Sequence, residues 1–137
     1  MREVRAWDKQ DNEMKNVRTL DFDQLGDISL VILIEYYEDH IQGCNWFEFP
    51  ERKPEDVKLM QCTGLKDSEG KEIYVDDIVS DGIHKGVVYF DEDRLQYRVK
   101  SGEGFTSEIT FSQSGSQTNK TGYKVLGNIH ENPELEV

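Results

Sequence analysis

A chain of 137 residues, 36% hydrophobic and 10% aromatic, is long enough to bury one hydrophobic core and too aromatic for a disordered segment. Its 28 acidic residues outnumber 16 basic ones, and the net charge of −12 argues against nucleic acids and anionic membranes as partners, since both attract basic surfaces. The charge favours either simple solubility or a surface that meets a basic partner, for example by imitating nucleic acid.

The first part of the chain is predicted to form short strands separated by polar turns. The expected strands cover residues 4–7, 14–22, 28–37 and 45–49, with turns at 9–13, 26–27 and 39–43. The stretch 28–37 is apolar without alternation, which fits either a strand covered on both faces or a helical segment buried all round. Its Ile, Val and Tyr content favours the strand.

A boundary between two structural halves is predicted at Pro50 and Pro54. Proline removes a backbone donor and restricts the residue before it, so two prolines this close interrupt a ladder. We therefore expect two small subdomains, residues 1–53 and 54–137, that fold together as one cooperative unit. Pro54 and the two acidic residues after it favour a brief helical turn.

The second part is predicted to be a series of hairpins. Strands are expected near 57–59, 71–79, 86–90, 95–99, 105–111 and 123–129, with a flexible, Ser/Gly/Gln-rich loop over 112–122. Short strands with glycine turns at close spacing favour a small, strongly bent, SH3-like barrel. The expected fold class is thus α+β, predominantly β.

Three segments resemble, in the same order, the YopX-like family encoded in phages and prophages of Gram-positive bacteria. They are RAWD at 5–8, LMQCTGLKDSEGKEIY at 59–74 followed by DDIV at 76–79, and VLGNIHENPEL at 125–135. The segment GVVYFD at 86–91 also fits the family's central hairpin. The resemblance implies a two-part, mostly β fold with a barrel-like second half, and a phage accessory role. It implies no activity, cofactor or catalytic residue.

The chain departs from the family pattern in two places. Family members commonly carry Gly-Asp where this chain has Asp76-Asp77, so the turn there is expected to be less tight. The stretch 20–53 contains none of the family segments quoted above, and its strands are predicted from propensity alone.

The candidate binding residues are aromatic and charged side chains from the resembling segments and from the aromatic strand at 45–49. Arg5 and Asp8 could form an ion pair that covers Trp7 and fixes the first strand to the core. Alternatively, Trp7 could contact a side chain of a binding partner. Trp46 and its neighbours admit the same two interpretations. Tyr74 is expected at the barrel rim, and Asp77 in an acidic turn.

No metal site or cofactor is predicted. The three histidines are far apart in sequence, and Cys44 and Cys62 lack metal-ligand spacing. The acidic turns at 76–77 and 91–93 could face each other and hold a divalent cation, but adjacent acids at β-turns are usually solvated.

The sequence predicts a cytoplasmic protein of the bacterial host cell that works by binding. Its first residues lack the apolar core of a signal peptide, residues 28–34 are too short to cross a bilayer, and both cysteines are expected to be thiols. We expect a non-enzymatic protein that binds a protein partner of the host or phage, with self-association also open. One alternative is a nucleic-acid-binding barrel with a basic face at Arg94, Arg98, Lys100 and Lys124. The other is a metal-dependent hydrolase in which Asp77 and Asp91 converge.

Overall fold

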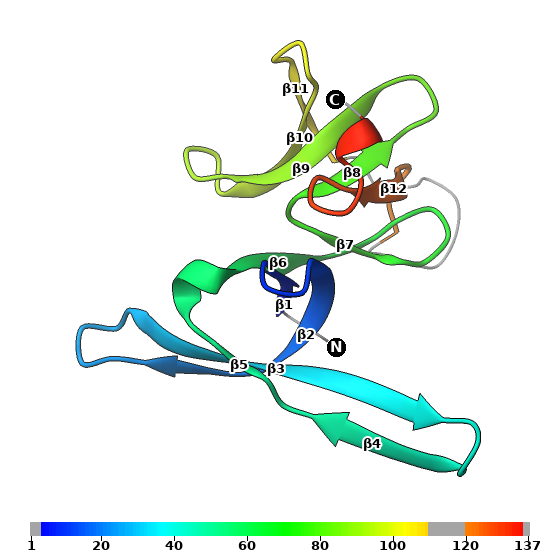
Figure 1. The fold of residues 1–137 in the computed structure, drawn as a ribbon. Coiled ribbons are helices and arrows are strands. Elements are labelled where there is room, and N and C mark those ends of the chain that lie inside the picture. Colours follow the sequence, from blue (N-terminus) through cyan, green and yellow to red (C-terminus); the bar gives the residue numbers. More distant parts are fainter. Residues whose placement is uncertain (1–3, 110–119, 136–137) are drawn as a thin grey trace. The chain divides into compact units, whose positions relative to one another are not determined.

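The structure, a computed structural model, describes residues 4–109 and 120–135 and is all-β in this part. The expectation of an α+β fold is wrong, because helical structure in the described residues is limited to two three-residue 3-10 turns, Pro54–Asp56 and Pro133–Leu135. The strands form two antiparallel sheets (Figure 1). The chain divides into two compact units, Met1–Met60 and Gln61–Val137.

The first unit is built on a sheet with strand order β4-β3-β2-β1-β6. The short strand β5 also pairs with β3. Its strands are β1 (Val4–Asp8), β2 (Glu13–Phe22), β3 (Ile28–Asp39), β4 (Cys44–Glu48), β5 (Glu51–Arg52) and the start of β6 (Val57–Lys66). These positions confirm the predicted strands of the first part of the chain.

The core of the first unit lies on one face of β3. Val31 and Leu33 are fully buried and pack with Ala6 and Val57, while Ile32, between them, is only half-buried. The second face of this strand is therefore covered only in part. The β-branched run extends the strand, but only its alternate residues reach the core.

The second unit contains a five-stranded sheet with strand order β11-β10-β9-β8-β12. The strands of that sheet are β8 (Asp77–Ser80), β9 (Lys85–Asp91), β10 (Gln96–Lys100), β11 (Thr106–Glu108) and β12 (Lys124–Asn128). The unit also contains the end of β6 and β7 (Glu72–Tyr74), which pair with each other. Its core comprises Ile73, Val79, Val88, Val99, Tyr123 and Val125. No ladder joins β11 to β12 in the described residues, so an open sheet stands there in place of the predicted small, bent barrel. Most of the loop predicted at 112–122 lies outside the described residues.

The two units divide at Met60–Gln61, within β6, rather than at the proline pair. The prolines do interrupt the sheet, but the chain between them returns to the first unit. The Leu33 amide donates to the Pro50 carbonyl at 2.9 Å, and the Lys9 amide donates to the Asp56 carbonyl at 3.0 Å.

The segments that carry the family resemblance place buried oxygen acceptors against backbone amides. Asp67, 1% exposed, accepts from the Glu69 and Lys71 amides at 2.9 and 2.8 Å and from the Val125 amide at 3.1 Å. Asp77 likewise accepts from the Tyr74 amide at 2.8 Å. These carboxylates satisfy backbone donors that water cannot reach, so their role is to hold turns in place.

The backbone at Asp76 adopts a conformation that favours glycine. Asp76 has φ of 73°, in the left-handed region that glycine adopts without a steric cost. Its side chain makes a compensating contact, 3.1 Å from His130 Nε2.

We expect Asp67→Ala to lower the free energy of unfolding by about 3 kcal/mol, because it leaves buried amides without acceptors. Urea unfolding followed by circular dichroism measures the change. Glu69→Ala, in the same turn but 66% exposed at its side chain, serves as the control and should change stability by less than about 0.5 kcal/mol. Equal effects of the two substitutions would contradict the assigned role of Asp67.

A second comparison tests the backbone at Asp76. Asp76→Gly and Asp76→Ala both remove the His130 contact, but only alanine keeps the steric cost of positive φ. Asp76→Gly should therefore be more stable than Asp76→Ala by about 1 kcal/mol in the same unfolding measurement. An alanine variant as stable as the glycine variant would show that the turn relaxes.

Candidate functional site

An exposed ribbon of the first unit is formed by the end of β3, the turn after it and β4. Strand β2 pairs with β3 only from Ile28 to Ile34, and beyond that point β3 pairs with β4 alone. Figure 1 shows this ribbon running out past the other strands of the unit. We call residues 35–49 the arm. A ribbon of two strands has little intrinsic stability in water, so its side chains must supply the cohesion.

Aromatic pairs on both faces supply that cohesion. Tyr37 stacks on Trp46, with ring centroids 5.4 Å apart and planes at 16°, and Tyr36 lies against Phe47 at 5.1 Å. Because neighbouring residues of a strand point to opposite faces, each face of the arm carries one pair. Trp46 remains 44% exposed and Phe47 55% exposed, so the pairs are held together and still open to solvent.

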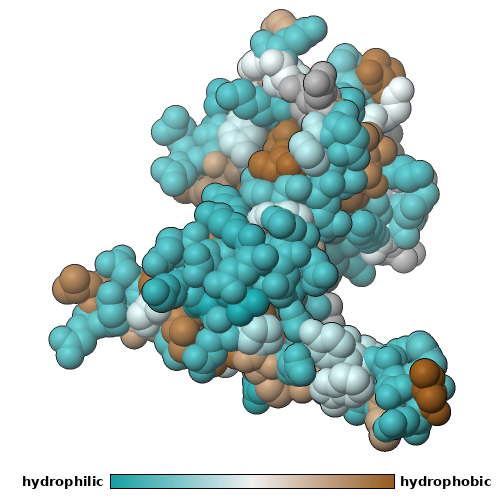
Figure 2. Space-filling view, viewed as in Figure 1, coloured by the Kyte–Doolittle hydropathy of each residue, from teal (hydrophilic) through white to brown (hydrophobic). Residues whose placement is uncertain are grey.

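The arm carries only negative formal charge. Residues 35–49 contain the acidic residues Glu35, Glu38, Asp39 and Glu48 and no lysine or arginine. Ile41, at the tip, is 96% exposed. Figure 2 shows pale surface along the arm and, at its largely teal end, a small brown, hydrophobic patch.

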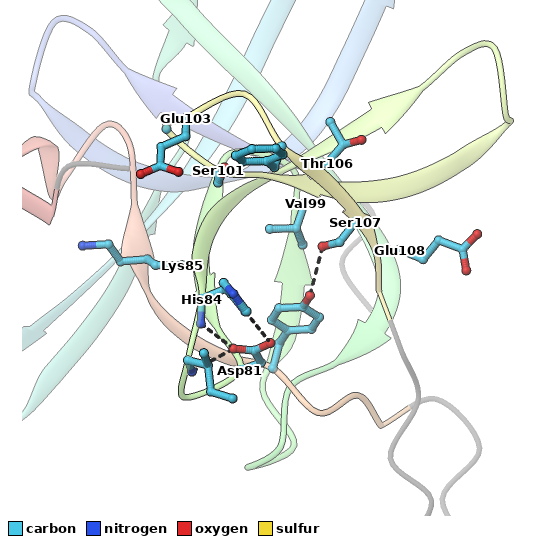
Figure 3. A pocket seen from close by; sticks show the side chains of 13 residues that line it. Asp81, His84, Lys85, Val99, Ser101, Glu103, Thr106, Ser107 and Glu108 are labelled. Atoms are coloured by element: carbon cyan, nitrogen blue, oxygen red, sulfur yellow. Dashed lines mark hydrogen bonds and ion pairs between the residues drawn. The ribbon is translucent and has the colours of Figure 1, made fainter.

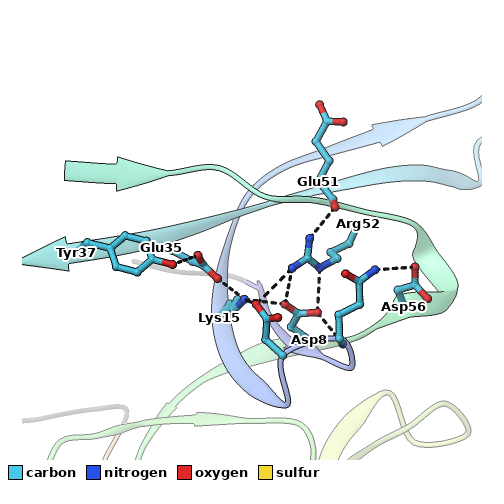
Figure 4. Close-up of polar contacts among 9 residues, drawn as sticks. Asp8, Lys15, Glu35, Tyr37, Glu51, Arg52 and Asp56 are labelled. Atoms are coloured by element: carbon cyan, nitrogen blue, oxygen red, sulfur yellow. Dashed lines mark hydrogen bonds and ion pairs between the residues drawn. The ribbon is translucent and has the colours of Figure 1, made fainter.

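A buried cluster of charged side chains lies at the base of the arm (Figure 4). Asp8 is fully buried and Lys15 is 5% exposed. Lys15 Nζ lies 2.7 Å from Asp8 Oδ2 and also contacts carboxylate oxygens of Asp11 and Glu35. Arg52 completes the cluster with two hydrogen bonds to Asp8, from Nε at 3.0 Å and Nη2 at 3.1 Å. The cluster thus ties together β1, β2, β3 and β5.

The charged state of the cluster is strongly favoured. Burial acts to raise the pKa of Asp8, but hydrogen bonds from Arg52, Lys15 and the Gln10 amide outweigh it and lower that pKa to about 2. Burial acts to lower the pKa of Lys15, but its three carboxylate partners outweigh it and raise that pKa. The two groups therefore remain ionised across the physiological pH range.

Glu35 connects this cluster to the arm. One of its oxygens contacts Lys15 Nζ, and the other accepts a hydrogen bond from the Tyr37 hydroxyl. The bond to Glu35 raises the pKa of Tyr37 to about 12, and the bond from Lys15 lowers the pKa of Glu35. Tyr37 is thus a protonated donor whose ring is held where it stacks on Trp46.

The same cluster has the oxygen atoms of a cation site. Carboxylate oxygens of Asp8, Asp11 and Glu35 lie within 4.8 Å of one another, which suits a hard cation such as calcium. The Lys15 ammonium contacts all three carboxylates, so the protein's own cation already lies among these oxygens.

The six residues predicted as binding candidates are distributed over both units. Trp46 lies in the arm and Asp8 in the buried cluster, whereas Tyr74 and Asp77 lie in the second unit. Arg5 and Trp7 project from the face of β1 opposite to Ala6 and Asp8, which are both buried. Asp8 consequently pairs with Lys15 and Arg52, instead of forming the suggested ion pair with Arg5 over Trp7.

Sequence reasoning missed the partners of these residues. It did not single out Tyr36 and Tyr37, although a Tyr-Tyr pair and Trp46-Phe47 flank a glycine-containing turn and would face each other in a hairpin. Arg52 and Glu35 gave no comparable signal, because Arg52 lies 44 residues from its partner Asp8 and Glu35 joins Lys15 from a different hairpin strand.

The two acidic turns proposed for metal chemistry serve their own backbones. Asp91 accepts from the Asp93 and Arg94 amides at 3.0 and 3.2 Å, and its second oxygen lies 3.1 Å from Arg94 Nη1. Asp77 is bonded to the Tyr74 amide. Neither belongs to a group of three candidate metal ligands in the described part of the chain.

The suggested basic face is largely neutralised. Arg94 and Arg98 both lie against Asp91, at 3.1 and 3.7 Å, and Lys124 lies 3.4 Å from Glu69. Lys100 is exposed. Three of the four cations named for nucleic-acid binding therefore have carboxylate partners.

The second unit contains a cavity of about 1050 Å³ (Figure 3). Val99 and Tyr123 form part of its buried lining, and Asp81 and His84 lie on its rim with side chains 3.6 Å apart. Ser107 Oγ is 3.3 Å from the Tyr123 hydroxyl. Acyl transfer would require a hydroxyl nucleophile hydrogen-bonded to His84. Among the described residues, the Ser107 hydroxyl contacts Tyr123 instead.

No helix in the described ranges is long and apolar enough to span a membrane.

Similarity to known proteins extends over both units. The family model described as YopX protein matches residues 3–135. The crystal structure of protein EF1440 from Enterococcus faecalis resembles the chain with a TM-score of 0.57 and 27% sequence identity, covering 97% of this chain and 96% of that protein. No curated protein matches the chain.

The buried cluster predicts a specific acid sensitivity. The pKa of Asp8 falls from its ordinary value of 3.8 to about 2 in the folded protein. A lowered folded-state pKa means that ionised Asp8 stabilises the fold above about pH 4, and that about 2 kcal/mol of this is lost as the pH falls toward 2. Asp8→Asn should cost about 3 kcal/mol at neutral pH, because two buried cations lose their counter-charge.

The difference in free energy of unfolding between the wild type and Asp8→Asn should become smaller as the pH falls from about 4 to about 2. Urea unfolding at several pH values measures this, with Asp27→Asn, an exposed acid of the same unit, as control. A difference that stays constant over this range would mean that Asp8 does not carry the predicted charge.

Proposed function

The chain belongs to the YopX family, and we propose that it is a non-enzymatic, cytoplasmic accessory protein that binds a protein partner of the phage or its host through the arm. The observation that carries this proposal is the pair of half-exposed aromatic contacts on opposite faces of a projecting ribbon. Aromatic side chains that stay open to solvent while held in one geometry are typical of the residues that dominate binding energy at protein interfaces.

The order of the arm in the free protein favours binding further. Tyr37 is fixed by Glu35 and stacked on Trp46, so a partner would not have to order these side chains. Preorganised side chains lose less conformational entropy when a complex forms. The arm therefore offers its aromatic surface at low entropic cost.

The polar chemistry of the described residues supports binding over catalysis. The buried carboxylates Asp67 and Asp77 accept hydrogen bonds from backbone amides, and Asp8 is neutralised by Lys15 and Arg52. A catalytic acid or base needs a proton-transfer role that such saturated groups do not offer. Both cysteines are free, which supports a reducing compartment.

The negative charge of the chain indicates that the partner's surface is positively charged. The chain carries −12 overall, and the arm adds four carboxylates without a basic residue. Such a surface speeds encounter with a basic protein and weakens the association as salt is added. A second copy of this chain would bring the same negative charge, so self-association through the arm is disfavoured.

We expect the double variant Trp46→Ser/Phe47→Ser to lose its partner. Affinity capture from phage-infected host cells should recover at least one protein with the wild type that the variant fails to retain, and that protein should be released by salt. Phe105→Ser, an exposed phenylalanine beside the cavity of the second unit, is the matched control and should still capture it.

Two results would contradict the proposal. Identical proteins captured by the wild type and the arm variant would exclude the arm as the binding surface. Loss of capture in Phe105→Ser but not in the arm variant would assign binding to the cavity of the second unit.

A further inference from the structure

We infer that the Trp46 face of the arm binds an arginine side chain, presented by an extended segment of the partner that adds to the free edge of β4. This inference rests on the proposed function and specifies its chemistry. It follows from the residues that share one face of the ribbon, from the charge left uncompensated there, and from the position of β4 in the sheet.

The face that carries the stacked pair also carries carboxylates. In the register of the hairpin, Tyr37 lies opposite Trp46, and Glu35 lies opposite Glu48 two residues away on the same face. Asp39 follows on that face toward the tip. An aromatic surface flanked by carboxylates suits a guanidinium, which stacks on aromatic rings and donates to carboxylates in one plane.

Only one of these carboxylates lacks a compensating group. Glu35 contacts Lys15, and Asp39 accepts hydrogen bonds from the Ile41 and Gln42 amides at 2.9 and 3.1 Å. Glu48 has no ion-pair partner among the described residues. Glu35 and Glu48 face each other across the hairpin, and like charges in such positions destabilise a strand pair. Lys15 supplies one cation for these two acids. An arginine from a partner would supply the second.

The edge of β4 provides a way to deliver that arginine. β4 is the terminal strand of its sheet and pairs only with β3 in the described part of the chain. An extended segment can add to such an edge through backbone hydrogen bonds, and its alternate residues then project onto the same face. One set of side chains would reach Trp46 and Glu48, and the other would reach Phe47 and Tyr36. The partner segment should therefore alternate arginine with apolar residues.

A peptide titration tests this chemistry directly. The probe is a capped eight-residue peptide of alternating arginine and leucine. The comparison peptide carries citrulline, which keeps the shape of arginine without its charge, at every arginine position. Binding to the full chain is followed by the indole N–H signals in nitrogen–proton correlation spectra, with the Trp46 signal assigned from Trp46→Phe.

We expect the arginine peptide to shift the Trp46 indole signal and the citrulline peptide to bind at least about threefold more weakly at low salt. Glu48→Gln should weaken binding of the arginine peptide by about threefold to fivefold. Glu38→Gln removes the same charge from the opposite face, beside Asn45, and should leave the affinity within about twofold of wild type.

The outcomes separate this inference from the proposed function. Equal binding of both peptides, or equal losses in Glu48→Gln and Glu38→Gln, would overturn arginine recognition while leaving an arm that binds. Absence of peptide binding, with a cellular partner still captured through Trp46 and Phe47, would also overturn only this inference. A partner captured without any dependence on the arm would overturn both.

Discussion

The fold of the first unit depends on the contact between the Lys15 ammonium and the buried Asp8 carboxylate. Neither charge can be removed from water without the other, and Arg52 supplies the further hydrogen bonds that a buried carboxylate requires. Because these residues come from separate strands, the pairing fixes how the strands meet. A buried ion pair of this kind contributes less to net stability than to selecting one arrangement, since every alternative leaves a charge unpaired.

The arm depends on this cluster through Glu35. A two-stranded ribbon with both aromatic pairs exposed would be expected to collapse or to associate with other chains. Glu35 anchors Tyr37 at the base, and the acidic residues along the ribbon oppose pairing with identical arms. The same carboxylates that keep the arm soluble give it a preference for cationic partners. Solubility and specificity are thus two consequences of one charge distribution.

The segments that identify the family have a structural role. Asp67 and Asp77 are buried acceptors for backbone amides, and Asp76 adopts a backbone conformation that favours glycine. Such residues specify turns. The surface that we propose for binding lies instead in residues 35–49, which the family match over residues 3–135 also covers.

The sequence by itself determined the antiparallel β character of the chain, most strand positions and the acidic surface, because alternation, turn residues and net charge act over short distances or by simple addition. It also indicated Trp46 and Asp8 as notable residues, without their partners. Only the tertiary structure decided that the second sheet is open in the described residues, that the units divide within β6, and that Asp8 meets Lys15 and Arg52. These outcomes depend on strand register and on contacts between residues far apart in the chain. Burial then gives such contacts an energetic weight that no local pattern reveals.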